Sequence, residues 1–162
     1  MPYYPYAGGR VEWLKPAGVI PAAQRLDAVK VIKAAAPASV NNNIEHGDRQ
    51  VLIVFTLPGA KEQSATPVGF MEGSDEHYFD DLLLYYDDPH SIYSNWPKDT
   101  WASIDSHQVR PGMSELQTRM SIGMKAQYDG QTEGDRTVDY EVNGKHIKVT
   151  YQHDKATTIQ NE

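Results

Sequence analysis

The chain has 162 residues, a formal net charge of −7 and no cysteine. A chain of this length buries about 70% of its unfolded surface, so it needs no disulfide or metal for stability, and one domain or two small ones sharing a core are expected. The negative charge and the lack of a lysine and arginine cluster argue against binding to nucleic acid or to an anionic membrane surface. The lack of cysteine excludes disulfides, thiolate catalysis and cysteine-based zinc sites. No apolar run approaches the length of a membrane span.

Proline, glycine and tyrosine dominate the first nine residues and predict an extended arm over residues 1–20. Its tyrosines either form a docking strip or fold back over the protein's own core. The next segment, Pro21–Ala35, has apolar residues at helical spacing and lysines toward its C-terminal end, and Pro37 follows it. This pattern predicts an N-terminal helix.

Three strands are expected after this helix. The apolar run Val51–Phe55 is typical of a strand buried on both faces. We expect Thr66–Phe70 to be an edge strand, because Pro67 cannot donate to a ladder. Tyr78–Tyr86 has apolar side chains on both faces, so it should be central. Residues 21–94 are therefore predicted to form an α+β unit, a helix with a small sheet.

Two short helices are predicted next. Pro97 stands at the first position of a helix over residues 96–104, whose Trp101 and Ile104 should face the core. Further on, Ser114 and Gln117 form a capping-box pattern at the start of a helix that Gly123 ends. That helix has only about two turns, so it must be held by packing.

Asn143-Gly144 between two alternating segments predicts a β-hairpin in which Val142 pairs with Lys145. This register places apolar residues on one face: Val138, Tyr140, Ile147 and Val149. The other face is polar and consists of Thr137, Asp139, Glu141, His146, Lys148 and Thr150. A third strand should follow, roughly over residues 156–159.

The order helix, helix, strand, strand, strand, together with Gly112-Met113-Ser114, Gln117 and Gly123, resembles the SmpA/OmlA family of small bacterial outer-membrane lipoproteins. Its helix-helix-three-strand unit is also the repeat of the β-lactamase inhibitor proteins. The resemblance covers residues 95–162 and implies a scaffold, assembly accessory or inhibitor that acts by binding other proteins. It provides no catalytic residue.

The sequence departs from this family at two points. Met124 stands where a proline often follows the helix-ending glycine, and no cysteine can carry a lipid anchor. The segment Met1–Tyr6 is no signal peptide, so we expect that Met1 replaces a removed leader. The resemblance then implies a periplasmic or outer-membrane-associated protein.

Acidic residues are dense around residues 75–88, with a histidine near each end: Asp75, Glu76, His77, Asp80, Asp81, Asp87, Asp88 and His90. Such a cluster either binds a divalent cation or is a solvated rim, and the second is favoured because adjacent side chains in a strand point apart. We expect no metal and no cofactor. Gly130–Gly134 is expected to be a flexible polar connection.

Nucleophile and general-base patterns are weak. His46, His107 and His153 stand in apparent loops, and His146 is explained as the cross-strand neighbour of Glu141. Ser114 is explained by its capping role, and Ser74 lies in no nucleophile motif. The sequence therefore favours a protein that is not an enzyme.

Tyr93 and Trp96 lie in the segment that joins the two halves, and such aromatics either dock a partner or pack in the core. The sequence as a whole predicts an α+β protein of the cell envelope that contacts an unidentified protein, through the polar hairpin face with Tyr93 and Trp96. A small-ligand or carbohydrate binder that uses Tyr85, Tyr93 and Trp96 is the alternative. A hydrolase comes third.

Overall fold

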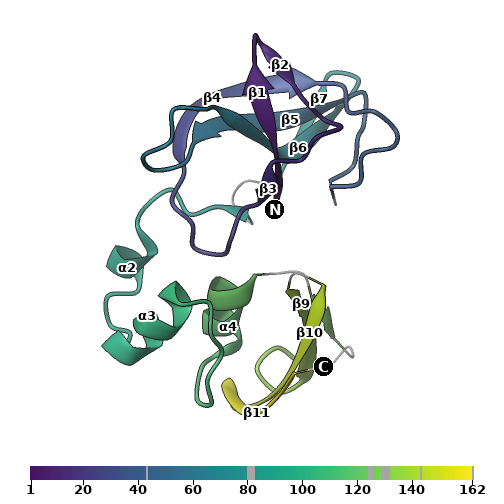
Figure 1. Cartoon of the computed structure of the whole chain (residues 1–162). Helices are drawn as coiled ribbons and strands as arrows, with labels where there is room; N and C mark the ends of the chain where they lie inside the picture. The colour runs from purple at the N-terminus through teal and green to yellow at the C-terminus, as the bar shows by residue number, and fades with distance from the viewer. Residues whose placement is uncertain (43, 80–82, 124–125, 129–131, 143, 162) are drawn as a thin grey trace. The chain divides into compact units, whose positions relative to one another are not determined.

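The computed structural model describes residues 1–42, 44–79, 83–123, 126–128, 132–142 and 144–161. Over these residues the protein is mostly β, with 42% strand and 14% helix, and two antiparallel sheets are described (Figure 1). The predicted α+β class is therefore wrong. The described residues contain three short helices and no N-terminal helix. The chain forms two compact units, residues 1–20 with 24–86, and residues 21–23 with 87–162.

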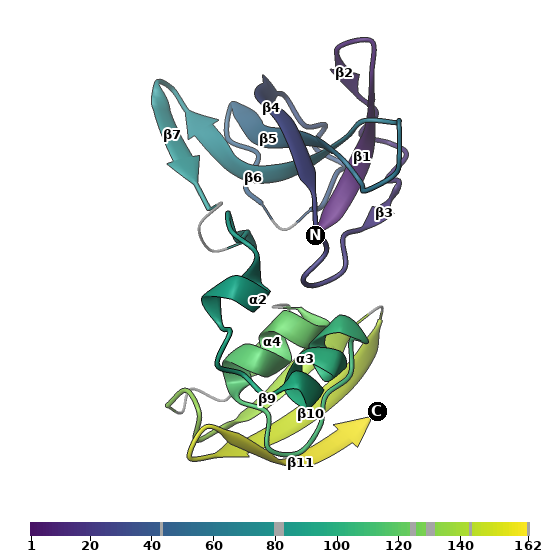
Figure 2. The same cartoon turned by 90° about the vertical axis from the view of Figure 1, so that its left-hand side faces the viewer.

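The first unit is a curled sheet, as Figures 1 and 2 show. Its strands are β1 (Pro2–Ala7), β2 (Arg10–Val11), β3 (Gly18–Val19), β4 (Asp27–Ala34), β5 (Arg49–Thr56), β6 (Ser64–Glu72) and β7 (Asp75–Tyr78). They follow the order β2-β1-β6-β5-β4, while β3 pairs with β1 and β7 pairs with β6.

The predicted helix over Pro21–Ala35 is replaced by strand β4. Ile32 and Ala34 pack against a buried cluster, whereas Val29 and Val31 are 50% and 57% exposed. Apolar residues at helical spacing suggested a helix, but the β-branched residues of this segment favour a strand, and antiparallel pairing with β5 along β4 outweighs the apolar spacing. The conformation of this segment is therefore set by its pairing with β5, which lies more than fifteen residues away in the sequence.

Strand β5 is buried on both faces, as predicted. Leu52 and Val54 belong to one buried cluster, and Val51 and Phe55 are fully buried as well. This strand pairs with β4 on one side and with β6 on the other, so it lies inside the sheet.

The prediction that Thr66–Phe70 is an edge strand is wrong, because β6 lies between β5 and two other strands. On that second side, β1 pairs with Ser64 and Ala65, and β7 pairs with Gly69 to Glu72. Pro67 lies between the residues that pair with β1 and those that pair with β7. Neither of these two pairings uses a backbone N–H at this position. A change of partner along the strand therefore accommodates the proline.

The predicted central strand over Tyr78–Tyr86 is also wrong. β7 ends at Tyr78, and the backbone N–H of Leu83 donates to the carbonyl of Phe79 at 3.1 Å, a helix-type contact. Over so short an apolar stretch, alternation does not distinguish a strand from a turn of helix. Leu82, Asp80 and Asp81 lie outside the described residues.

The first residues belong to the sheet, since β1 pairs with β6 and Tyr4 is 3% exposed. The Tyr4 ring lies 5.0 Å from that of Trp13, and Tyr3 meets Phe55 edge-on at 5.9 Å. Of the two alternatives for these tyrosines, the structure shows the one in which they cover the protein's own core.

The second unit places helices on one four-stranded sheet. Its elements are α2 (Pro89–Ile92), α3 (Lys98–Asp105), α4 (Glu115–Ile122), β8 (Ala126–Tyr128), β9 (Thr137–Val142), β10 (Lys145–Gln152) and β11 (Lys155–Asn161). The strand order is β11-β10-β9-β8. The predicted helices α3 and α4 and the third strand, β11, are confirmed, whereas α2 and β8 were not predicted.

Local signals in this unit are confirmed in detail. Ser114 Oγ accepts the Gln117 N–H at 3.1 Å and Gln117 Oε1 accepts the Ser114 N–H at 2.9 Å, which is the predicted capping box. Gly123 ends the helix with φ +100°. The β9–β10 register is the predicted one, from Val142 opposite Lys145 onward. Asn143 lies outside the described residues.

The core of the second unit lies between its helices and one face of its sheet (Figure 2). The buried residues of that sheet face are Val138, Tyr140, Val149, Tyr151 and Ala156. The helices bury Trp101, Ile104, Met113 and Met120 in a second cluster, and Ile122 packs against the sheet. The opposite face of the hairpin is the polar one.

Candidate functional site

The polar hairpin face brings together the six residues that the sequence singled out: Thr137, Asp139, Glu141, His146, Lys148 and Thr150. The hydroxyls of Thr137 and Thr150 are hydrogen-bonded across the strands at 3.0 Å. His146 lies opposite Glu141 in the backbone register, as predicted, but its Nδ1 contacts Asp139 Oδ1 at 2.9 Å. The imidazole therefore contacts the diagonal carboxylate, that of Asp139.

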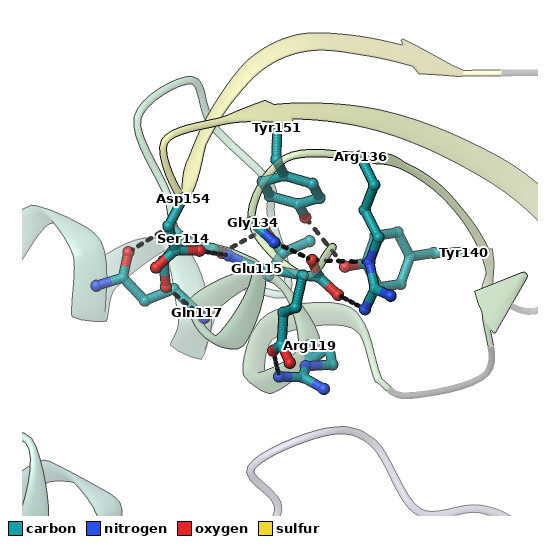
Figure 3. Close-up of polar contacts among 11 residues, drawn as sticks. Ser114, Glu115, Gln117, Arg119, Gly134, Arg136, Tyr140, Tyr151 and Asp154 are labelled. Atoms are coloured by element: carbon teal, nitrogen blue, oxygen red, sulfur yellow. Dashed lines mark hydrogen bonds and ion pairs between the residues drawn. The ribbon is translucent and has the colours of Figure 1, made fainter. Parts of the chain in front are cut away.

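A buried ion pair lies on the other side of the same sheet (Figure 3). Glu115, at the start of α4, is 1% exposed, and its two carboxylate oxygens accept from Arg136 Nη2 at 2.6 Å and Nε at 3.2 Å. The backbone N–H of Gly134 donates to the same carboxylate at 3.0 Å. Three donors from one loop therefore hold this carboxylate.

The charge state of this pair follows from those contacts. Burial raises the pKa of Glu115, but hydrogen bonds from Arg136 and Gly134 outweigh it and leave the pKa below its ordinary value. The hydrogen bond to Glu115 raises the pKa of Arg136, whose guanidinium also lies over the Tyr128 ring at 4.2 Å. Glu115 is ionised at neutral pH and is placed to fasten a loop, not to donate a proton.

The segment before β9 is held in place near its C-terminal end by contacts of Gly134. Its carbonyl accepts the Asp154 N–H at 2.9 Å, and Asp154 Oδ1 accepts the Glu115 N–H at 3.0 Å. A Cβ at Gly134 would lie 3.1 Å from that of Asp154, and its φ is +83°. The expected flexible connection is thus anchored at Gly134, while residues 129–131 lie outside the described part.

A small cavity of about 90 Å³ adjoins the ion pair and is lined by residues of α4, β8 and β9 together with Arg136. Arg119 extends along it and forms an ion pair with Glu133, while its Nε is buried without a hydrogen-bond partner among the described residues. The two arginines are matched by the two glutamates. Both arginines that line the cavity therefore already have a carboxylate partner.

Two buried tyrosines complete this side of the sheet. The hydroxyls of Tyr140 and Tyr151 are hydrogen-bonded to each other at 3.0 Å. Burial raises the pKa of Tyr140, and it raises the pKa of Tyr151 to about 12. Both therefore stay neutral over the ordinary pH range and serve as packed, hydrogen-bonded core.

Tyr93 and Trp96 pack against the helical core of the second unit. Their rings stack at 4.3 Å, and Trp96 lies 5.2 Å from Trp101. Both are half-buried against the helical cluster. Tyr85 belongs to the first unit and is 45% exposed. The packing of Tyr93 and Trp96 agrees with the core role that the sequence left open beside the docking role.

The acidic cluster around residues 75–88 is divided between different elements. Asp75, Glu76 and His77 lie on β7, and the hydrogen bond from Lys33 lowers the pKa of Glu76. Asp88 caps α2 and contacts His90. Within the described ranges, no group of three or more histidine and acidic residues could hold a metal ion.

The remaining singled-out histidines contact backbone or stand at a turn. His46 Nε2 lies 2.8 Å from the Val40 carbonyl, and His107 Nδ1 lies 3.0 Å from that of Ser121. His153 occupies the β10–β11 turn with φ +51°. Near His107, an open hollow of about 270 Å³ is lined in addition by Ile147 and Ile159.

No family model matches the chain, nor does any curated protein or solved structure. The helices among the described residues are all too short to cross a membrane.

Proposed function

We propose that this protein acts by binding another protein, and that the polar face of β9 and β10 is its contact surface. The observation that carries the proposal is the hairpin register, which aligns six polar side chains on the sheet face opposite the helices. Hydrogen bonds between Thr137 and Thr150 and between His146 and Asp139 hold part of this face in a fixed arrangement. A preorganised polar surface loses less side-chain freedom on binding.

The surface carries both signs of charge, which suits a partner with a complementary polar patch. Asp139 and Glu141 provide negative charge and Lys148 provides positive charge. In the register, Lys148 lies opposite Asp139 and His146 lies opposite Glu141. Such patterns contribute mainly to specificity and to the association rate. The resemblance to SmpA/OmlA proteins points in the same direction, toward an accessory or inhibitor of the bacterial envelope that has no catalytic role.

The chemistry of the buried groups agrees with binding. Glu115 is the most deeply buried carboxylate described, and its oxygens are held by Arg136 and Gly134. The same contacts lower its pKa, so it is a poor candidate for a general acid. The ion pair instead fixes the loop that leads into β9, the first strand of the proposed contact face.

The test compares two double variants in cross-linking capture from a bacterial envelope extract. Glu141→Ala with Lys148→Ala removes one charge of each sign from the face. The matched control, Glu72→Ala with Lys98→Ala, removes the same charges at exposed positions elsewhere. We expect at least one protein captured by the wild type to be lost from the face variant and kept by the control. Identical capture by all three proteins would contradict the proposed surface.

A further inference from the structure

His90 lies between two carboxylates that come from different helices. Its Nδ1 contacts Asp88 Oδ1 at 3.0 Å, and its Nε2 contacts Asp105 Oδ1 at 3.3 Å. The ring also stacks on Trp101, with 4.0 Å between the centroids and 23° between the planes. Asp88 is the N-cap of α2, while Trp101 and Asp105 belong to α3.

The protonation state of the imidazole decides how many of these contacts are attractive. A neutral imidazole carries one N–H and one lone pair, so it can donate to only one of the two carboxylates. The other carboxylate would then face a lone pair. Only the imidazolium has a donor on each nitrogen, and only that form satisfies both carboxylates while its cationic ring lies on an indole.

We propose that His90 is a pH-sensitive clamp, which fastens α2 to α3 when its ring is protonated and loosens α2 when the ring is neutral. The helix that it holds has four residues, and none of them is buried. So short a helix is marginal without tertiary contacts. The clamp acts on α2 together with the Asp88 cap and the stacking of Tyr93 on Trp96.

The surrounding charges set the pH at which the clamp opens. Asp88 and Asp105 are the charged groups that act on the ring, and the third neighbour, Trp101, carries no charge. Burial lowers the pKa of His90, but the hydrogen bonds to Asp88 and Asp105 outweigh it and raise the pKa above 6.5. Because the folded-state value is raised, the stabilisation is complete below pH 6.5 and is lost as the pH rises through the folded-state value.

The first measurement is an NMR titration of the His90 ring in the full chain, assigned with the His90→Gln variant. We expect a midpoint above 6.5 for the wild type. The Asp105→Asn variant should lower that midpoint by about half a unit or more, because it removes one carboxylate. The control His153→Asn changes a histidine at the β10–β11 turn and should leave the His90 curve unchanged. A wild-type midpoint at or below 6.5, or an unchanged midpoint in Asp105→Asn, would overturn the proposal.

The second measurement tests the release itself. The Ile92 and Tyr93 amides donate within α2, and their hydrogen-exchange protection reports its opening. After correction for the intrinsic pH dependence of exchange, we expect the protection of these amides in the wild type to fall at least about threefold as the pH rises through the His90 midpoint. In His90→Gln, which cannot titrate, it should stay constant. Constant protection in the wild type would refute the clamp even if His90 titrates as expected.

Discussion

Glu115 lies in the first turn of α4, and its carboxylate accepts hydrogen bonds from the loop that precedes β9. Its side chain and that of Arg136 are 2% and 11% exposed, so water does little to screen the pair. Removing one partner of such a pair leaves the other charge buried and uncompensated, which costs more than the pair itself contributes.

We therefore expect Glu115→Gln to reduce the free energy of unfolding by about 3–5 kcal/mol in urea denaturation. Glu133→Gln removes a carboxylate that pairs with Arg119 at a more exposed site, and it should change stability by about 1 kcal/mol or less. Equal losses for the two variants would mean that burial of Glu115 is not what makes it important.

Gly69 of β6 lies directly against the backbone of β7. A Cβ at this position would lie 2.1 Å from the His77 carbonyl oxygen, a backbone atom of β7 that cannot turn aside. Gly69→Ala should therefore destabilise the protein by about 2–4 kcal/mol in thermal or urea unfolding. Ser74→Ala, at an exposed position in the neighbouring turn, is the control and should stay within about 0.5 kcal/mol of the wild type.

The helices and strands that were predicted correctly depend mainly on residues close in sequence. The Ser114 capping box and the β9–β10 register depend on residues close in sequence, and both are confirmed. Strand β4 depends on its pairing with β5, and the helical spacing of its apolar residues led to the wrong prediction there. β8 has only three residues, too few for a periodic signal.

The candidate site was predictable to the same extent. The six residues of the polar face were found because alternation and a two-residue turn define a face. The pair of Glu115 with Arg136 was missed because 21 positions separate the partners and neither stands in a motif. The only available signal was a glutamate in the first turn of a capped helix, and that position is usually explained by the helix dipole.

At the scale of the whole molecule, ionisable groups limit stability at high pH. The pKa of Tyr151 is raised by burial to about 12 and that of Tyr140 is raised further, while both ionise near pH 10 in the unfolded chain. Their stabilisation is thus complete below pH 10 and is lost as the pH rises toward the folded-state values. We expect the urea midpoint to fall steeply between about pH 10 and 12, and less steeply in Tyr140→Phe. A parallel fall in both proteins would contradict this origin.

The pairing of β1 with β6 has a consequence for the order in which the chain folds. The hydroxyl of Thr66 donates to the Pro2 carbonyl across 64 positions, whereas β10 and its neighbours join through short turns. Distant contacts require a large loop to close first, so β1 should dock late, after the folding transition state. Tyr4→Leu should then accelerate unfolding while leaving the refolding rate nearly unchanged in stopped-flow kinetics. A strand that docks last is also the first to leave, so unfolding of the first unit should begin with the detachment of β1 and its buried Tyr4 from β6.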